Sequence, residues 1–232
     1  MSLEPADPRV RQQPGRPRRL NKRGVARQDA LTLHAVRLIS HRGIDQVRVV
    51  DVCRAAGVPT SVFYWYFRDL DDLVAKAIVD ARRLIRRSVA ATISDIEDPL
   101  ARIYVSARDC ARLMIENEVL RVFTVGDVET SIAGEYADEV GKSIEVFIHD
   151  SIVMLSEGQV RGLVRDDKAA PHLAHCIRSV VHFNVVSYHR GILHGEPGVL
   201  ADTIASFAVR GVCSELRQAQ EVEEAWSAAN ET

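Results

Sequence analysis

The segment from Val49 to Phe67 reads VVDVCRAAGVPTSVFYWYF and has the pattern of two short helices joined by a tight turn. In its first part, apolar residues recur at the i, i+3, i+4, i+7 spacing of one buried helical face. Gly57 follows, and glycine adopts the left-handed conformation of such a turn more readily than any other residue. In the second part, Phe63 and Phe67 mark the buried side. The segment therefore predicts a helix-turn-helix, a motif that reads DNA.

Polar and aromatic residues accompany these two phenylalanines on the second helix. Tyrosine and tryptophan carry a polar group on a flat ring, so they are better suited to contacts with phosphates and base edges than to a dry core. The residues that we expect at the DNA surface are Thr60, Ser61, Tyr64, Trp65 and Tyr66.

Residues 56–67 follow the pattern Ala-Gly-Val-x-x-x-x-Phe-Tyr-x-Tyr-Phe, and a predicted first helix, from Arg27 to about Arg42, precedes them. Together these features resemble the N-terminal part of the TetR family of bacterial transcriptional regulators. Over the rest of the chain the likeness is confined to length, helical pattern and the run from Gly158 to Asp167, which resembles the approach to the family's penultimate helix.

The hydrophobic periodicity predicts an all-α protein of about nine helices. The proline- and arginine-rich composition of residues 1–26 predicts a disordered basic arm. The resemblance implies a three-helix DNA-binding domain with the helix-turn-helix (27–69) and a C-terminal helical domain for ligand binding and dimerisation (70–232). We expect the later helices at residues 70–89, 100–115, 118–125, 134–155, 167–190 and 197–226.

The composition is that of a globular protein, since 232 residues, 47% of them hydrophobic, can bury a sizeable core. No apolar run is long enough to span a bilayer, and the arginine-rich N-terminus lacks the apolar segment of a signal peptide. We therefore expect a cytoplasmic protein with no membrane contact. The cysteines form no CxxC pair, which argues against a zinc site or a disulfide framework. Reduced, buried thiols are expected at Cys53, Cys110, Cys176 and Cys213.

The net charge of −2 conceals a strong asymmetry along the chain. Residues 1–88 carry 18 Lys and Arg against 9 Asp and Glu, whereas the remainder carries 12 against 23. Attraction to phosphates supplies most of the sequence-independent affinity for DNA. We therefore expect only the basic first part to face the duplex, and the acidic part to have a different partner.

The first residues form a proline- and arginine-rich arm. Its core, Pro14 to Arg19, resembles the AT-hook, in which a Gly-Arg-Pro backbone lies in a narrow A·T-rich minor groove. The alternative is a solvated charged tail that adds only nonspecific affinity. The arm residues expected to contact DNA are Arg16, Arg18, Arg19, Lys22 and Arg23.

The resemblance implies further DNA contacts, residue by residue. Base-facing positions of the family's recognition helix fall here on Thr60, Ser61, Val62 and Tyr64. Tyr66 is expected near the DNA backbone. Val50, on the preceding helix, is also expected to contact the DNA.

Three positions depart from the family pattern. Arg48 stands where a threonine commonly caps the second helix, Pro59 where a serine caps the recognition helix, and Leu70 where a lysine holds phosphate. Three carboxylates surround Leu70 and would repel phosphates unless they face away: Asp69, Asp71 and Asp72. Our hypothesis is that the arm, helped by Arg48 and Arg68, offsets this weakened anchor. The alternative is that these arginines form a solvated basic face.

The acidic part should hold a small-molecule effector, because regulators of this family bind one among their fifth to eighth helices and then leave DNA. The resemblance also implies a homodimer through the last two helices, a palindromic operator, and repression. The effector is expected to be apolar or amphipathic. Arg108 could pair an anionic ligand, or an acidic neighbour such as Asp109 or Glu116. Candidate lining residues are Tyr104, Arg108, Phe123, Phe147, Met154, His182, Phe183 and Tyr188.

Other functions have weaker support in the sequence. His175, His182 and His189 share a helical stripe, but successive members lie about 10 Å apart at 1.5 Å per residue, too far to share one metal ion. No nucleotide-binding loop, nucleophile motif or zinc-protease motif occurs, so no catalytic residue and no cofactor are expected. An architectural DNA-binding protein that depends mainly on its arm remains a second interpretation.

Overall fold

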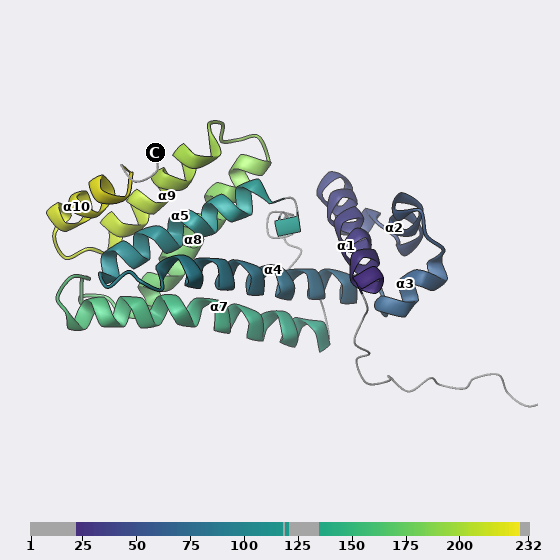
Figure 1. Ribbon diagram of the computed structural model, residues 1–232, viewed down its shortest axis with the longest axis horizontal. Helices are drawn as coiled ribbons and strands as arrows, with labels where there is room; N and C mark the ends of the chain where they lie inside the picture. Colours follow the sequence, from purple (N-terminus) through teal and green to yellow (C-terminus); the bar gives the residue numbers. More distant parts are fainter. Residues whose placement is uncertain (1–21, 118, 121–134, 228–232) are drawn as a thin grey trace, which may run out of the picture.

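A computed structural model describes residues 22–117, 119–120 and 135–227. Within these ranges the chain is helical and has no strand beyond one isolated bridge, so the predicted all-α class is confirmed (Figure 1). The elements are α1 (Lys22–Arg42), the 3-10 turn η1 (Ile44–Gln46), α2 (Val49–Ala56), α3 (Thr60–Tyr66), α4 (Leu70–Ile93), α5 (Pro99–Glu116), α7 (Glu135–Val160), α8 (Ala170–His189), α9 (Pro197–Val212) and α10 (Leu216–Ser227).

The first three α-helices pack around a small apolar core and lie at one end of the molecule (Figure 1). Leu31 and Ile39 of α1 are buried together with Val52 of α2 and Phe63 of α3. Between α2 and α3, Gly57 has φ +66°, and this left-handed conformation favours glycine. The turn therefore forms where the sequence predicted it.

One continuous helix, α4, joins this end of the molecule to the rest (Figure 1). The carboxylate of Asp69 caps it by accepting a hydrogen bond from the backbone N–H of Asp72, 2.8 Å away. Its apolar stripe, which includes Leu73, Ile78 and Ile85, is buried against α1 at its beginning and against α5 and α7 further along.

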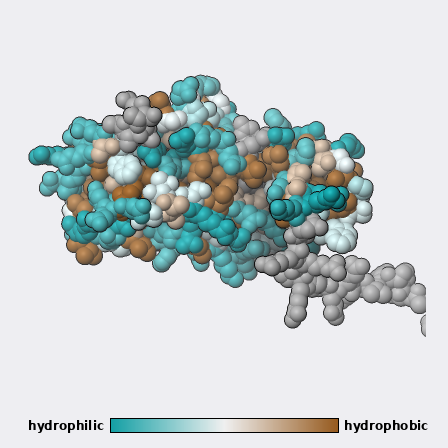
Figure 2. Space-filling view, in the orientation of Figure 1, coloured by the Kyte–Doolittle hydropathy of each residue, from teal (hydrophilic) through white to brown (hydrophobic). Residues whose placement is uncertain are grey.

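The C-terminal body is built around α5, which contacts α4, α7, α8, α9 and α10. Asp98 caps α5 and Pro99 occupies its first turn, where the missing N–H costs nothing. The body's surface is mostly hydrophilic in the view of Figure 2, but hydrophobic groups show along the lower edge, where α7 runs. This agrees with the exposure of Val146, Val153 and Val160 on that helix.

Several predicted boundaries differ from the structure. Helix α1 begins at Lys22, so the last residues assigned to the arm are helical. Helices α4 and α7 run to Ile93 and Val160, further than predicted. Cys176 is exposed, although a buried thiol was expected. The predicted helix at residues 118–125 and arm residues 1–21 lie outside the described residues, apart from the short piece at 119–120.

The predicted helix at residues 197–226 is wrong in one respect, because it is two helices with a break after Val212. The chain there pairs with the loop that follows α7. The N–H of Arg165 donates to the carbonyl of Val212, and the N–H of Ser214 donates to the carbonyl of Leu163, both at 2.9 Å. These long-range bonds replace helical ones, and α10 then turns back onto α5 and α9.

A glycine makes this pairing possible. Gly158, near the end of α7, lies so close to the loop that a Cβ atom would come within 2.4 Å of Cγ2 of Val164. Val164 is itself buried and pairs with Cys213. In the part of the chain that the structure describes, no helix is long and apolar enough to cross a membrane.

Candidate DNA-binding and effector sites

Two phenylalanines fix the orientation of α3. Phe63 and Phe67 are buried, with ring centroids 5.4 Å apart. The opposite face is open, since Tyr64 is 61% and Trp65 73% exposed. Thr60 and Ser61 are exposed as well, while Val62 and Tyr66 are half-buried. The helix therefore turns a polar and aromatic surface away from the protein.

The two caps that depart from the family pattern behave differently. The backbone N–H of Arg48 donates to Oδ2 of Asp51, 3.1 Å away, so one half of a capping box forms although arginine has no acceptor atom. Pro59 precedes α3 without any side-chain cap bond. Both Arg48 and Val50 have exposed side chains beside α3 and are free of the core.

The acidic residues around Leu70 are largely engaged within the protein. Asp72 is buried and accepts hydrogen bonds from the N–H of Arg68, at 2.8 Å, and from Nζ of Lys76, at 3.0 Å. Asp69 caps α4. Burial raises the pKa of Asp71, and the neighbouring charge of Asp69 adds to the effect. Two of the three carboxylates therefore have hydrogen-bond partners within the protein, and Asp72 is also paired with the ammonium group of Lys76.

The start of α7 is docked onto this same turn. Tyr136 is buried, and its hydroxyl donates to Oδ2 of Asp69 at 3.2 Å. The guanidinium of Arg68 lies over its ring, 4.6 Å from the centroid. Burial raises the pKa of Tyr136 to about 12, and the charges of Asp69 and Asp72 contribute to the rise. The α3–α4 turn is thus attached to the C-terminal body at a second point, besides α4 itself.

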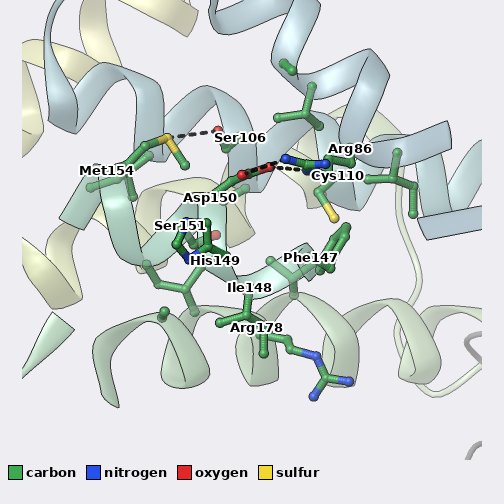
Figure 3. A pocket seen from close by; sticks show the side chains of 18 of the residues that line it. Arg86, Ser106, Cys110, Phe147, Ile148, His149, Asp150, Ser151, Met154 and Arg178 are labelled. Atoms are coloured by element: carbon green, nitrogen blue, oxygen red, sulfur yellow. Dashed lines mark hydrogen bonds and ion pairs between the residues drawn. The ribbon is translucent and has the colours of Figure 1, made fainter. Parts of the chain in front are cut away.

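A cavity of about 580 Å³ lies among α4, α5, α7 and α8, within the range of small-molecule sites. Its walls are mainly apolar, and its polar lining side chains include Arg82, Arg86, Arg178 and Asp150. Figure 3 shows Cys110 and Phe147 close together at one side and the pair Arg86 and Asp150 near the centre. Burial raises the pKa of the Cys110 thiol to about 12, which keeps it neutral.

The structure brings some of the predicted lining residues to this cavity and places others elsewhere. Phe147, Met154 and His182 line it. Tyr104 is buried outside it, where its hydroxyl donates to Asp202, 3.3 Å away.

Three other described residues among those predicted, Arg108, Phe183 and Tyr188, do not line the cavity either. Arg108 pairs with its neighbour Asp109 at 2.9 Å. Tyr188 stacks edge-on against His189, and Phe183 is 71% exposed. Phe123 lies outside the described residues.

Sequence reasoning missed the charged residues of the cavity. Arg82 is buried and donates to the carbonyl of Val140, at 3.0 Å, and to Oγ of Ser143, at 2.5 Å. Arg86 forms a two-bond pair with Asp150. Each contact joins α4 to α7 across about sixty positions of sequence. Only a predicted packing of these two helices could have revealed them.

The late histidines do not cluster. His182 lines the cavity, and Nε2 of His189 lies 3.0 Å from the carbonyl oxygen of Met114. Within the described ranges, no three His, Cys, Asp or Glu side chains come close enough together to hold a metal ion.

Comparison with known proteins supports the class that the helix-turn-helix defines, a DNA-binding transcription regulator. Residues 31–77 match the family described as "Bacterial regulatory proteins, tetR family". The match extends from α1 into α4 and includes all of the helix-turn-helix. The N-terminal domain of this chain therefore matches the DNA-binding domain of the TetR family. No curated protein matches the sequence.

Solved structures share the fold over about four fifths of the chain. The fatty acid degradation regulator FadR from Bacillus halodurans has a TM-score of 0.70 at 13% identity, over 84% of this chain and 98% of that one. FadR from Bacillus subtilis, in complex with stearoyl-CoA, has a TM-score of 0.68 at 16% identity, over 79% and 98%. AibR, in complex with isovaleryl coenzyme A and operator DNA, has a TM-score of 0.67 at 16% identity, over 78% and 97%.

Proposed function

We propose that the protein is a ligand-responsive repressor that binds a palindromic operator as a homodimer and leaves it when a small molecule fills the cavity. The observation that carries the proposal is the course of α4. Its first turns pack against α1 in the DNA-binding domain, and Ile85, Val89 and Ile93 line the cavity further along. An effector that moves α4 therefore changes the orientation of α3. The proposal assigns the chain no catalytic activity.

The proposed DNA-reading surface is the exposed side of α3 together with the start of α2. We propose that Thr60, Ser61, Val62, Tyr64 and Trp65 meet base edges, and that Arg48, Val50 and Tyr66 lie at the flanks. Exposed tyrosine and tryptophan in a short helix, held by two buried phenylalanines, support this assignment.

The basic arm is proposed to add phosphate contacts that Leu70 cannot make. Lys22 and Arg23 are exposed in the first turn of α1, at the end from which Arg16, Arg18 and Arg19 would extend. Deleting residues 1–21 leaves α1 intact and should lower DNA affinity and flatten its dependence on salt. Equal affinity with and without these residues would contradict a role for the arm.

The dimer interface is proposed on α8 and α9. Val199, Thr203 and Phe207 recur at intervals of four on the outer face of α9, and Phe183 is exposed on α8. Large exposed apolar side chains on adjoining helices are typical of a protein–protein interface. Although α10 packs on α9, the side chains of Val199 and Phe207 remain exposed.

The effector is proposed to be a small molecule with an apolar body. The apolar lining favours such a ligand, and two regulators with the same fold were solved with acyl-coenzyme A molecules bound. Acyl-coenzyme A compounds are therefore the first candidates.

The test combines DNA selection with a ligand screen. The purified protein selects sequences from a random duplex pool, and fluorescence anisotropy then measures binding to the selected DNA. We expect a two-fold symmetric consensus, and release of DNA by compounds that raise the thermal unfolding temperature. A pool without consensus would favour an architectural DNA-binding protein. A ligand that stabilises the protein without weakening DNA binding would contradict the induction mechanism.

A further inference from the structure

An ion pair spans the cavity between α4 and α7. Nε of Arg86 lies 2.5 Å from Oδ2 of Asp150, and a second guanidinium nitrogen lies 3.1 Å from Oδ1. Both residues line the cavity (Figure 3), and both side chains remain partly open to solvent. The hydrogen bonds to Asp150 raise the pKa of Arg86 further. This is the bidentate geometry in which arginine binds carboxylates and phosphates most strongly.

The cavity has both charged and apolar lining residues. Around the ion pair, His149 and Val153 are exposed and mark the mouth. The lining also contains buried apolar side chains, among them Ile103, Leu155 and Val181. A molecule that fills this space needs a charged or polar end at the mouth and a hydrocarbon end inside.

The charge of the lining favours an anion. Among the described residues that line the cavity, Arg82, Arg86 and Arg178 are cationic, whereas Asp150 is the single carboxylate. Arg82 is buried and held by Val140 and Ser143 of α7. Arg86 is the arginine at the mouth, and its present partner is a side chain that can move into solvent.

We propose that the effector is an anionic amphiphile whose acidic head replaces Asp150 on Arg86 while its hydrocarbon chain occupies the apolar interior. This inference rests on the proposed function and specifies the effector class. After this exchange, Arg86 is still paired with an anionic group, now that of the ligand, and the carboxylate of Asp150 is solvated by water. It also separates α4 from α7 at this point, because the bond between the helices becomes a bond between α4 and the ligand.

Isothermal titration calorimetry with three probes of equal chain length tests the proposal: dodecanoate, dodecanoyl-coenzyme A and neutral 1-dodecanol. We expect the wild-type protein to bind an anionic probe severalfold more tightly than dodecanol, because three arginines and only one carboxylate line the cavity among the described residues. Arg86→Gln should abolish that preference. Asp150→Asn should strengthen binding of the anion severalfold, because it removes the competitor, and should leave dodecanol unchanged.

A matched control lies one helical turn away. Arg83 is exposed on α4 and pairs with Asp80 outside the cavity, so Arg83→Gln should leave all three affinities unchanged. Ala107 lies in the cavity wall, and Ala107→Phe should prevent binding of every probe.

The outcomes distinguish failure of the anionic head group from failure of the cavity as an effector site. Equal affinity for dodecanoate and dodecanol, unaffected by Arg86→Gln, would overturn the anionic head but leave the cavity as an effector site, provided that Ala107→Phe blocks both. Weaker anion binding by Asp150→Asn would overturn the exchange. Failure of all three probes to bind the wild-type protein would overturn this inference and count against an acyl effector. The tighter of the two anions identifies the source of the head group, a free acid or a coenzyme A thioester.

Discussion

The hydroxyl of Tyr136 donates a hydrogen bond to Asp69, the residue that caps α4, across 3.2 Å. The first turn of α7 is thereby attached to the end of the DNA-binding domain. Further along, α7 lines the cavity with Phe147, Asp150 and Met154. Helix α7 therefore lines the cavity and also contacts the turn that follows α3. It forms a second connection between the cavity and the DNA-binding domain, besides α4.

Removing that hydroxyl should weaken the attachment without disturbing the ring. Tyr136→Phe is expected to lower the free energy of unfolding by about 1 kcal/mol, the usual value of one hydrogen bond. Urea denaturation measures it, and Tyr64→Phe, at an exposed position, is the control. The difference should be full below pH 10 and shrink as the pH rises towards 12, because the folded state holds the neutral phenol at a raised pKa. A difference independent of pH would contradict this reasoning.

The close approach at Gly158 predicts a sharp contrast between two glycines of one helix. Gly158→Ala should destabilise the protein by about 1–3 kcal/mol, because the new methyl group meets the buried, stiff side chain of Val164. Gly141→Ala, with open space around it, should stabilise the protein by up to about 1 kcal/mol. Thermal and urea unfolding of both variants provide the measurement, and similar effects of the two would refute it.

The attachment of α10 to α9 depends on Glu223. Its carboxylate accepts hydrogen bonds from Arg210, at 2.7 and 2.6 Å, and from Ser206, at 2.8 Å. The hydrogen bonds from Arg210 lower the pKa of Glu223 despite its burial. Glu223→Gln should therefore cost about 1 kcal/mol at neutral pH.

The pH dependence of that cost has a definite sign. A depressed pKa contributes stability above the unfolded value of 4.5 and loses it as the pH falls through the folded value. The difference between wild type and Glu223→Gln should thus vanish in acid. Glu221→Gln changes an exposed pair with Arg217 on the same helix and should have almost no effect. A cost that persists in acid would point to packing instead.

Charge placed on the proposed dimer face should produce folded monomers. Phe183→Glu, and separately Phe207→Glu at a side chain 65% exposed, are expected to raise the dimer dissociation constant at least about a hundredfold, because each change occurs twice across a symmetric interface. Sedimentation velocity measures the change. Val160→Glu, at a side chain 89% exposed on α7, should leave the dimer intact. A wild-type monomer would refute the interface.

The recognition helix offers a test that separates DNA affinity from stability. Trp65→Ala should weaken binding to the selected operator severalfold and leave the free energy of unfolding within about 0.5 kcal/mol, since the indole is exposed. Phe63→Ala, at a buried side chain, should instead destabilise the protein by about 3–5 kcal/mol. Unchanged operator affinity for Trp65→Ala would remove the indole from the interface.

The helix-turn-helix could be predicted because its determinants are local. The buried sides of α2 and α3 and the conformation of Gly57 depend on spacing within one short segment. The break after Val212 could not be predicted in this way, because apolar periodicity continues through Cys213 and the cause is a loop about fifty positions earlier in the chain. The start of α1 at Lys22 does have a local signal, because Asn21 is a residue type that commonly caps helices, and the prediction overlooked it.

In the candidate effector site, too, some features follow from local sequence and others depend on long-range packing. Phe147, Met154 and His182 could be selected as large side chains on predicted helices, and they do line the cavity. Tyr104 and Phe183 satisfied the same criterion, but one is in the core and the other on the surface. Residue type alone does not distinguish these three environments. The Arg86 and Asp150 pair depends on the register of α4 against α7, which periodicity leaves undetermined.

The continuity of α4 has a geometric consequence for how little the effector must do. Leu70 and Arg86 are separated by roughly 24 Å along the helix axis, so a rotation of about 5° around the Arg86 end displaces the Leu70 end by about 2 Å. In the proposed two-fold dimer, the same displacement occurs in both subunits and changes the distance between the two α3 helices. A small movement of the lining side chains is therefore enough to change the spacing of the two α3 helices, so that it no longer matches the spacing of successive major grooves.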